Sequence, residues 1–126
     1  MSQKVSFTAD AAISRGEGVQ IQADDTAILA AGSAEPAMFV AFEDVAAGSL
    51  GAFYTPGSGQ VYGIAEGSIG AGERLVNSES ADGAFATIGT VSAGTSVNVV
   101  GVALTDAVDG GPVWLSFSPS YYTEPV

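Results

Sequence analysis

The chain has 126 residues, a usual length for a single domain; almost half of them are apolar, and seventeen are glycine. It contains no cysteine and no histidine, which excludes disulfides, thiolate chemistry, the usual zinc sites and every histidine general base. Only Lys4, Arg15 and Arg74 are basic, against fourteen acidic residues, so the net charge is −11 and binding to nucleic acid or to an anionic membrane is disfavoured.

The N-terminal stretch, "MSQKVSFTADAA", lacks the apolar core of a secretory signal, and no window reaches the roughly 18 apolar residues of a membrane span. We therefore expect a soluble protein made in the cytoplasm. Residues 1–12 are interpreted as an arm that becomes ordered against another protein, with a frayed terminus as the alternative. Within this arm, Val5 and Phe7 share one face of a short alternating segment. That segment is the candidate for a strand added to a partner's sheet: Lys4, Val5, Ser6, Phe7 and Thr8.

Further along the chain the apolar pattern has period two. Strand candidates are residues 19–22, 38–42, 60–65, 97–100 and 113–117. In the last of these, Val113, Leu115 and Phe117 occupy one face and Trp114 the other. Glycine-containing pairs between the candidates are turn signals. The pattern predicts an all-β domain, a sandwich or a small barrel of short strands.

An internal repeat relates the two halves of the chain. "ISRGEGV" begins at Ile13 and is echoed by "IGAGERL" from Ile69, while "VAFEDVAAG" from Val40 is echoed by "VALTDAVDG" from Val102. We predict two related strand–turn–strand units, at about 13–54 and 69–117, within one β domain spanning 13–118. Shared turn preferences are the alternative explanation of the match.

The C-terminal segment, residues 119–126, is predicted to be a tail. Its two prolines interrupt strand pairing, and Tyr121 and Tyr122 are too large to stay exposed without a reason. Together with Trp114, these two tyrosines are the candidate contacts between subunits.

The acidic residues raise the question of catalysis. Asp24, Asp25, Asp106 and Asp109 adjoin glycine or threonine in expected turns, where an aspartate commonly caps the backbone. Their spacing is not that of a calcium-binding loop, and the glycine-rich stretches lack the residues of a phosphate cradle. We expect no enzyme activity, no catalytic residue, no cofactor and no resident metal; an incidental cation at a subunit interface is the open alternative.

Several of these stretches resemble the small capsid decoration, or cement, proteins of tailed bacteriophages. The resemblance is carried by "ISRGEGVQI", "IGAGERLV" and "VVGVALTDAVDGGPVWLSF", and it extends over about residues 6–118. Arg74 and the aromatic tail depart from that pattern.

The resemblance implies a β-sandwich or β-tulip-like domain that forms a homotrimer. It further implies a structural virion protein that binds the outer surface of the capsid and stabilises contacts between copies of the major capsid protein. Lys4–Thr8 would then be the capsid contact. Two alternatives remain open: a carbohydrate-binding or adhesin-like module that stacks sugars on Tyr54, Tyr62 or Trp114, and a tail or fibre subunit.

Overall fold

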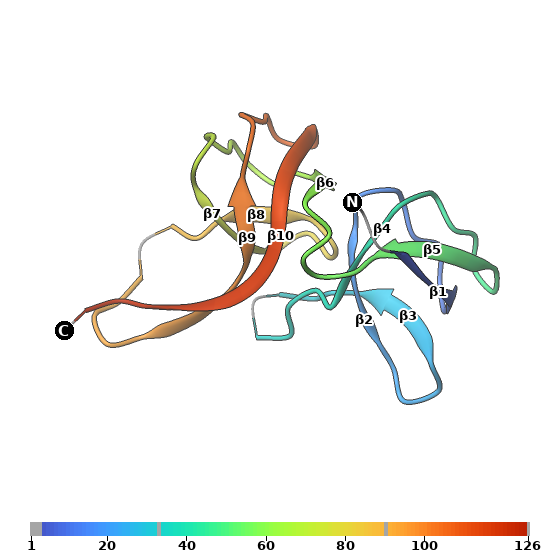
Figure 1. Cartoon of the computed structure of the whole chain (residues 1–126). Coiled ribbons are helices and arrows are strands. Elements are labelled where there is room, and N and C mark those ends of the chain that lie inside the picture. The colour runs from blue at the N-terminus through green and yellow to red at the C-terminus, as the bar shows by residue number, and fades with distance from the viewer. Residues whose placement is uncertain (1–3, 33, 90, 126) are drawn as a thin grey trace.

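The computed structural model describes residues 4–32, 34–89 and 91–125. This part of the chain forms ten strands in two five-stranded sheets, so the predicted all-β class is confirmed. The first sheet closes into a small barrel, and the second packs beside it (Figure 1). Within these ranges there is no helix of the length and apolar character that a membrane span requires.

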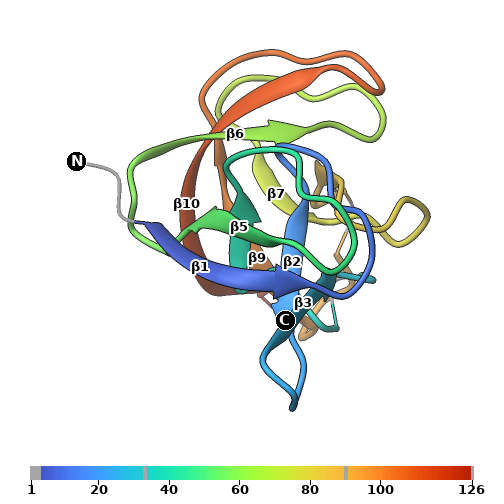
Figure 2. The same ribbon diagram turned by 90° about the vertical axis from the view of Figure 1, so that its right-hand side faces the viewer.

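The barrel contains the first five strands, in the order β1-β3-β2-β4-β5 (Figure 2). They are β1 (Lys4–Ala9), β2 (Gly18–Ile21), β3 (Thr26–Leu29), β4 (Phe39–Ala41) and β5 (Leu50–Tyr54). Antiparallel pairing of β1 with β5 and a short parallel contact of β1 with β3 close the circle.

The second sheet contains the other five strands, in the order β6-β10-β9-β7-β8. They are β6 (Gln60–Ile64), β7 (Arg74–Asn77), β8 (Phe85–Thr87), β9 (Ser96–Ala103) and β10 (Pro112–Thr123). Its two outer strands approach each other at a single parallel bridge, Ala65↔Phe85.

The second sheet repeats the connectivity of the barrel. β2 pairs with β3 and β4 as β7 pairs with β8 and β9, and β5 lies between β4 and β1 as β10 lies between β9 and β6. Isolated bridges also correspond, Ile13↔Val45 in the first half and Ile69↔Ala107 in the second. The two halves thus share one strand topology, while the residue limits of the predicted units remain a prediction.

Two apolar clusters fill the interior. One lies within the barrel around Val19 and Phe53, and the other is centred on the second sheet around Leu75, Phe85 and Leu115. The second cluster also takes in Ala30, Ala37, Val40 and Tyr54 of the first half. The two halves therefore share one core and are held together as one body.

Close backbone contacts fix the junction between the halves. The Gly18 N–H donates to the Gly83 carbonyl at 2.8 Å, and the Gly83 N–H donates to the Ala30 carbonyl at 2.8 Å. A Cβ on Gly18 would lie 3.1 Å from the Asn77 side-chain nitrogen and 3.2 Å from the Phe85 ring. The same Cβ would lie 2.7 Å from the Ala37 Cβ of the first half, so glycine at position 18 allows both this loop and the second sheet to approach β2 closely.

The predicted N-terminal arm is wrong for residues 4–9, and residues 1–3 lie outside the described part of the chain. Lys4–Ala9 form β1, which is joined to β5 over the five pairs from Lys4↔Tyr54 to Thr8↔Leu50. Val5 and Phe7 pack against the barrel cluster. Burial of this apolar face inside the same chain holds the segment in the barrel.

The predicted C-terminal tail is also wrong for residues 119–123, which continue β10; residue 126 lies outside the described part. The β9–β10 register shifts between Phe117 and Ser120, and pairing then resumes through Thr123↔Ser96. Pro119 falls within this irregularity, where a strand tolerates a residue without an N–H.

Candidate functional site

The repeated aspartates join separate loops of each half. Asp106 Oδ1 accepts a hydrogen bond from the Ala71 N–H at 2.8 Å, and Asp44 Oδ1 accepts one from the Arg15 N–H at 2.8 Å. Each bond links the segment that follows the bend after β9 or β4 to the turn that opens the same half, across 35 and 29 residues. We call these two contacts the loop staples. They satisfy exposed main-chain donors, which is a structural role.

The glutamate of each opening turn caps the same turn. Glu17 Oε1 accepts from the Ser14 N–H at 2.6 Å, and Glu73 Oε1 accepts from the Gly70 N–H. Burial raises the pKa of Glu17 above its usual value; the hydrogen bond from Ser14 opposes that shift, and the nearby Asp44 carboxylate adds to it. Both halves therefore use the same pair of acidic residues, one for the cap and one for the staple.

Replacing either staple aspartate by alanine is expected to lower the free energy of unfolding by about 1 kcal/mol, because one charge-assisted hydrogen bond is lost in each case. The double variant Asp44→Ala/Asp106→Ala should lose about the sum, since the two bonds lie in different halves. Chemical denaturation monitored by circular dichroism measures this effect. Asp10→Ala, which removes another exposed carboxylate, is the matched control, and equal stability of all four proteins would refute the staple role.

The other aspartates are also held in turns. Asp24 accepts hydrogen bonds from the Thr26 hydroxyl at 2.6 Å and from the Thr26 N–H at 3.2 Å, and these bonds lower its pKa. Asp109 Oδ1 accepts from the Gly67 N–H at 2.8 Å. Asp25 has a φ of 67°, a turn conformation that aspartate tolerates. In the described ranges, no cluster of three or more His, Cys, Asp or Glu side chains is arranged to hold a metal ion.

All three basic side chains of the sequence lie over aromatic rings. The Lys4 ammonium is 3.9 Å from the Phe42 ring centroid, the Arg15 guanidinium is 4.0 Å from that of Tyr62, and the Arg74 guanidinium is 4.6 Å from that of Tyr122. Contacts of this kind stabilise by about 0.5–1 kcal/mol each at exposed sites. Positive charge is thus fixed at three places on a protein that is otherwise acidic.

The candidate capsid-contact residues, Lys4–Thr8, lie on one strand of the barrel. Lys4 and Ser6 are exposed, whereas Val5 and Phe7 are half-buried. The Phe7 ring lies 5.1 Å from that of Phe39 and 6.1 Å from that of Phe53. The side chains that this segment presents to the outside are therefore the polar ones, and its apolar side chains belong to the barrel core.

The candidate subunit-contact residues are not gathered in one place. Trp114 is half-buried and lies edge-on to Tyr62, with ring centroids 5.5 Å apart and an interplanar angle of 81°. Tyr122 is half-buried beside Arg74, and its hydroxyl donates to Glu124 at 2.7 Å, which raises the pKa of the tyrosine. Tyr121 is 77% exposed. Of the three, Tyr121 is the side chain that is available to a partner.

The aromatic residues proposed to stack sugars do not form an open platform. Tyr54 is buried in the shared core. Arg15 covers the Tyr62 ring, and Trp114 meets it edge-on. A sugar needs an accessible aromatic face, so this arrangement does not favour the carbohydrate-binding alternative.

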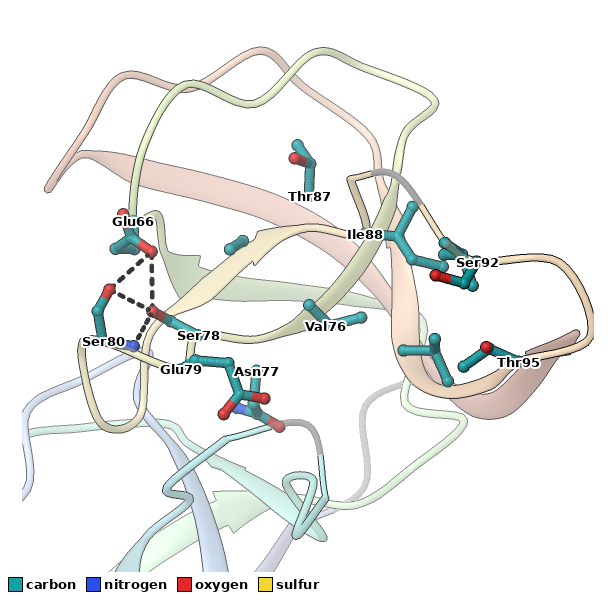
Figure 3. A pocket seen from close by; sticks show the side chains of 13 residues that line it. Glu66, Val76, Asn77, Ser78, Glu79, Ser80, Thr87, Ile88, Ser92 and Thr95 are labelled. Atoms are coloured by element: carbon teal, nitrogen blue, oxygen red, sulfur yellow. Dashed lines mark hydrogen bonds between the residues drawn. The ribbon is translucent and has the colours of Figure 1, made fainter. Parts of the chain in front are cut away.

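A pocket of about 450 Å³ with a mixed polar and apolar lining opens beside β7 and β8 (Figure 3). Glu66 Oε1 accepts hydrogen bonds from the Ser78 and Ser80 hydroxyls at 2.9 and 3.2 Å. Asn77 is fully buried; its Oδ1 accepts from the Ala37 N–H at 2.6 Å, while its Nδ2 has no hydrogen-bond partner among the described residues. The described residues that line this pocket include no aromatic side chain. The sequence pattern did not reveal it, because its polar residues carry no recognisable spacing.

Comparison with known proteins is informative for solved structures. No protein-family model matches the sequence, and no curated protein does either. Among solved structures, the head fiber gp8.5 N base of bacteriophage phi29 has a similar fold, with a TM-score of 0.70 and 25% sequence identity. The match covers 94% of this chain and 95% of that one. It supports a structural protein of a phage virion.

The match spans both halves of the chain, so it concerns the arrangement of the two sheets and not one barrel alone. The phage virion part of the sequence interpretation is therefore supported, in the coarse form of a phage structural protein. Decoration of the capsid, the trimeric state and the capsid contacts go beyond this comparison.

Proposed function

We propose that this protein is a decoration protein of a phage head, which binds the outer capsid surface as a homotrimer and stabilises contacts between major capsid proteins. The observation that carries the proposal is the similarity of nearly the whole chain to the base of a phage head fiber. Such a base belongs to the head, so the proposed location is the outer surface of the virion. The proposed role is mechanical, with no catalytic step and no cofactor.

The charge distribution supports an outward location. The net charge is −11, and each of the three cations is engaged with an aromatic ring of the same chain. Such a surface repels a polyanion such as the packaged genome. An outer position keeps the protein and the genome on opposite sides of the capsid shell.

The proposed mechanism is multivalent binding. A trimer that contacts several capsid subunits at once turns weak single contacts into strong overall binding through effective concentration. Lys4–Thr8 remain the candidate capsid contact, now as a strand of the barrel that presents Lys4 and Ser6 and not as a detached arm. Because Lys4–Thr8 belong to the barrel, we expect capsid binding to require an intact barrel.

A head-fibre base is the second candidate, and the same comparison favours it directly. Both roles require attachment to the capsid, but only decoration requires that the capsid become more stable. The two roles are distinguished by comparing the temperature at which capsids disassemble with and without the bound protein.

The test is co-sedimentation of the purified protein with capsids that lack it, taken from the phage that encodes it. The protein should pellet with the capsids in a saturable manner, and the decorated capsids should disassemble at a higher temperature. Saturable binding without a change in capsid stability would assign the head-fibre role. Protein that stays in the supernatant at every concentration, together with binding to saccharides on a glycan array, would instead identify a carbohydrate-binding module.

A further inference from the structure

The far ends of β9 and β10 form a two-stranded ribbon that leaves the second sheet. Ser96–Val99 pair with Ser120–Thr123, whereas β6 pairs with Pro112–Ser116 and β7 with Gly101 and Val102. We call Ser96–Val99 with Ser120–Thr123 the terminal ribbon. Figure 1 shows it projecting from the body, with the C-terminus at its tip. Two strands alone are only marginally stable in water, so a ribbon of this kind gains from a further partner.

One face of the terminal ribbon is anchored to its own chain. Val99 is buried, and the Tyr122 ring lies under the Arg74 guanidinium of β7. Tyr121 is the residue before Tyr122 in the strand, and because side chains alternate it lies on the other face. It is the most exposed of the large apolar and aromatic side chains in the described ranges, at 77%, ahead of Val108 at 72%.

The outer edge of β10 offers main-chain groups for pairing. The Glu124 N–H donates to the Thr95 carbonyl at 3.0 Å, and hydrogen-bonded pairs alternate along an antiparallel ladder. By this alternation, the N–H and C=O groups of Tyr121 and Thr123 point away from β9. No strand of the described part pairs with this edge beyond Ser116. An exposed edge of this kind is a template for another strand.

A groove lies over the terminal ribbon and reaches the outer strand, β10. It measures about 210 Å³ and is lined by uncharged residues, Pro36, Asn98, Val99, Pro119, Ser120 and Tyr121. Pro36 comes from the barrel half, so the groove lies between the terminal ribbon and the loop that precedes β4. It supplies an apolar surface next to the open strand edge.

The charge pattern indicates what occupies this edge. Residues 83–105 and 110–123 contain no charged side chain, in a chain with fourteen acidic residues. Association of two copies elsewhere on the surface would bring carboxylates together, and like charges repel. The terminal ribbon itself carries no carboxylate, and the adjoining Glu124 accepts a hydrogen bond from Tyr122, on the face opposite Tyr121. Two copies that meet at the Tyr121 face therefore bring fewer carboxylates together than they would elsewhere.

We propose that copies of this chain associate through the terminal ribbon, with the outer edge of β10 in one copy pairing with the ribbon of the next and Tyr121 packed at the contact. The inference identifies the surface for the oligomer in the proposed function. It needs no capsid, because it concerns the free protein. A contact that joins different edges of neighbouring ribbons is heterologous and closes into a ring if the rotation allows.

The test is sedimentation velocity on the full chain over a range of concentrations, for the wild type, Tyr121→Pro, Tyr121→Glu and Val108→Glu. Proline at 121 removes an N–H that points away from β9, so it leaves the ribbon ladder intact while blocking the edge. Glutamate at 121 introduces a like charge at the contact. Val108→Glu adds the same charge at a comparably exposed site outside the terminal ribbon.

The wild type and Val108→Glu should be oligomeric, and both Tyr121 variants should dissociate with a constant raised by about tenfold or more, equivalent to at least 1.4 kcal/mol. Far-UV circular dichroism checks that the variants are folded, and the Glu variant keeps the test valid if proline disturbs the ribbon.

A wild type that is monomeric at high concentration, or Tyr121 variants that associate like the wild type, would overturn the proposal. Loss of capsid binding by Tyr121→Glu in a monomeric protein would assign the edge to the capsid protein instead. Oligomers that fail to pellet with capsids would leave this surface established and refute only the decoration role.

Discussion

Replacing Phe85 by alanine is expected to lower the free energy of unfolding by about 3–5 kcal/mol, a large part of the roughly 5–15 kcal/mol that stabilises a typical domain. The Phe85 side chain is fully buried. Its ring fills the space above two glycines, since a Cβ on Gly18 would lie 3.2 Å from it and one on Gly63 would lie 2.9 Å from it. Because Gly18 belongs to the barrel and Gly63 to β6, the cavity would open at the junction of the two halves.

Urea unfolding followed by circular dichroism and by intrinsic fluorescence measures this loss. Phe42→Ala is the matched control: Phe42 is 36% exposed, and its edge-on contact with Tyr54, at 5.3 Å between centroids, contributes only about 1 kcal/mol. Equal destabilisation by the two substitutions would contradict the placement of Phe85 in a shared core.

Deleting residues 1–9 is expected to abolish cooperative unfolding of the barrel. The deletion removes β1, its five pairs with β5 and the burial of Val5 and Phe7. Phe53, which is fully buried, would lose the ring of Phe7 and be exposed at a new sheet edge. Scanning calorimetry should show a weaker or absent transition, and a dye that binds exposed apolar surface should bind the truncated protein.

The point variant Lys4→Ala is the control for this truncation, because it removes an exposed side chain of β1 and keeps the strand. It should unfold cooperatively, at a temperature close to that of the wild type. A truncated chain with an unchanged transition temperature would show that residues 1–9 form a separable arm, contrary to their place in the barrel.

The alternation of apolar residues was sufficient to predict the fold class. Val113, Leu115 and Phe117 are buried as their pattern indicated, while Trp114 lies on the other face and is half-buried. The short strand β8 gave no such signal. β8 consists of Phe85–Thr87, and a three-residue segment is too short to show a period.

The two ends of the chain were misinterpreted for a physical reason. Proline was taken to stop pairing, but Pro119 lies at a shift of register, after which β10 pairs with β9 again. Near the N-terminus, Val5 and Phe7 were correctly placed on one face. The sequence could not indicate whether the strand that pairs with this segment belongs to the same chain, because β5 lies more than forty residues away.

The repeated aspartates show the same limit. The glycine four residues after each aspartate indicated turns, and the structure places Asp44 and Asp106 directly after bends and ahead of the turns at Gly48 and Gly110. Their hydrogen-bond partners lie 29 and 35 residues earlier in the chain, which local spacing cannot reveal. One loop staple occurs at the corresponding place in each half, so the two aspartates belong to the architecture that the halves share.

The most direct test of the central claim is an electron cryomicroscopy reconstruction of the virion that contains this protein. If the protein decorates the capsid, we expect copies of its density, one barrel with a five-stranded sheet beside it, on the outer face of the capsid at positions where three capsid subunits meet. We also expect their absence from virions of a deletion mutant. Density confined to the tail, or heads identical in wild-type and deletion virions, would contradict the account.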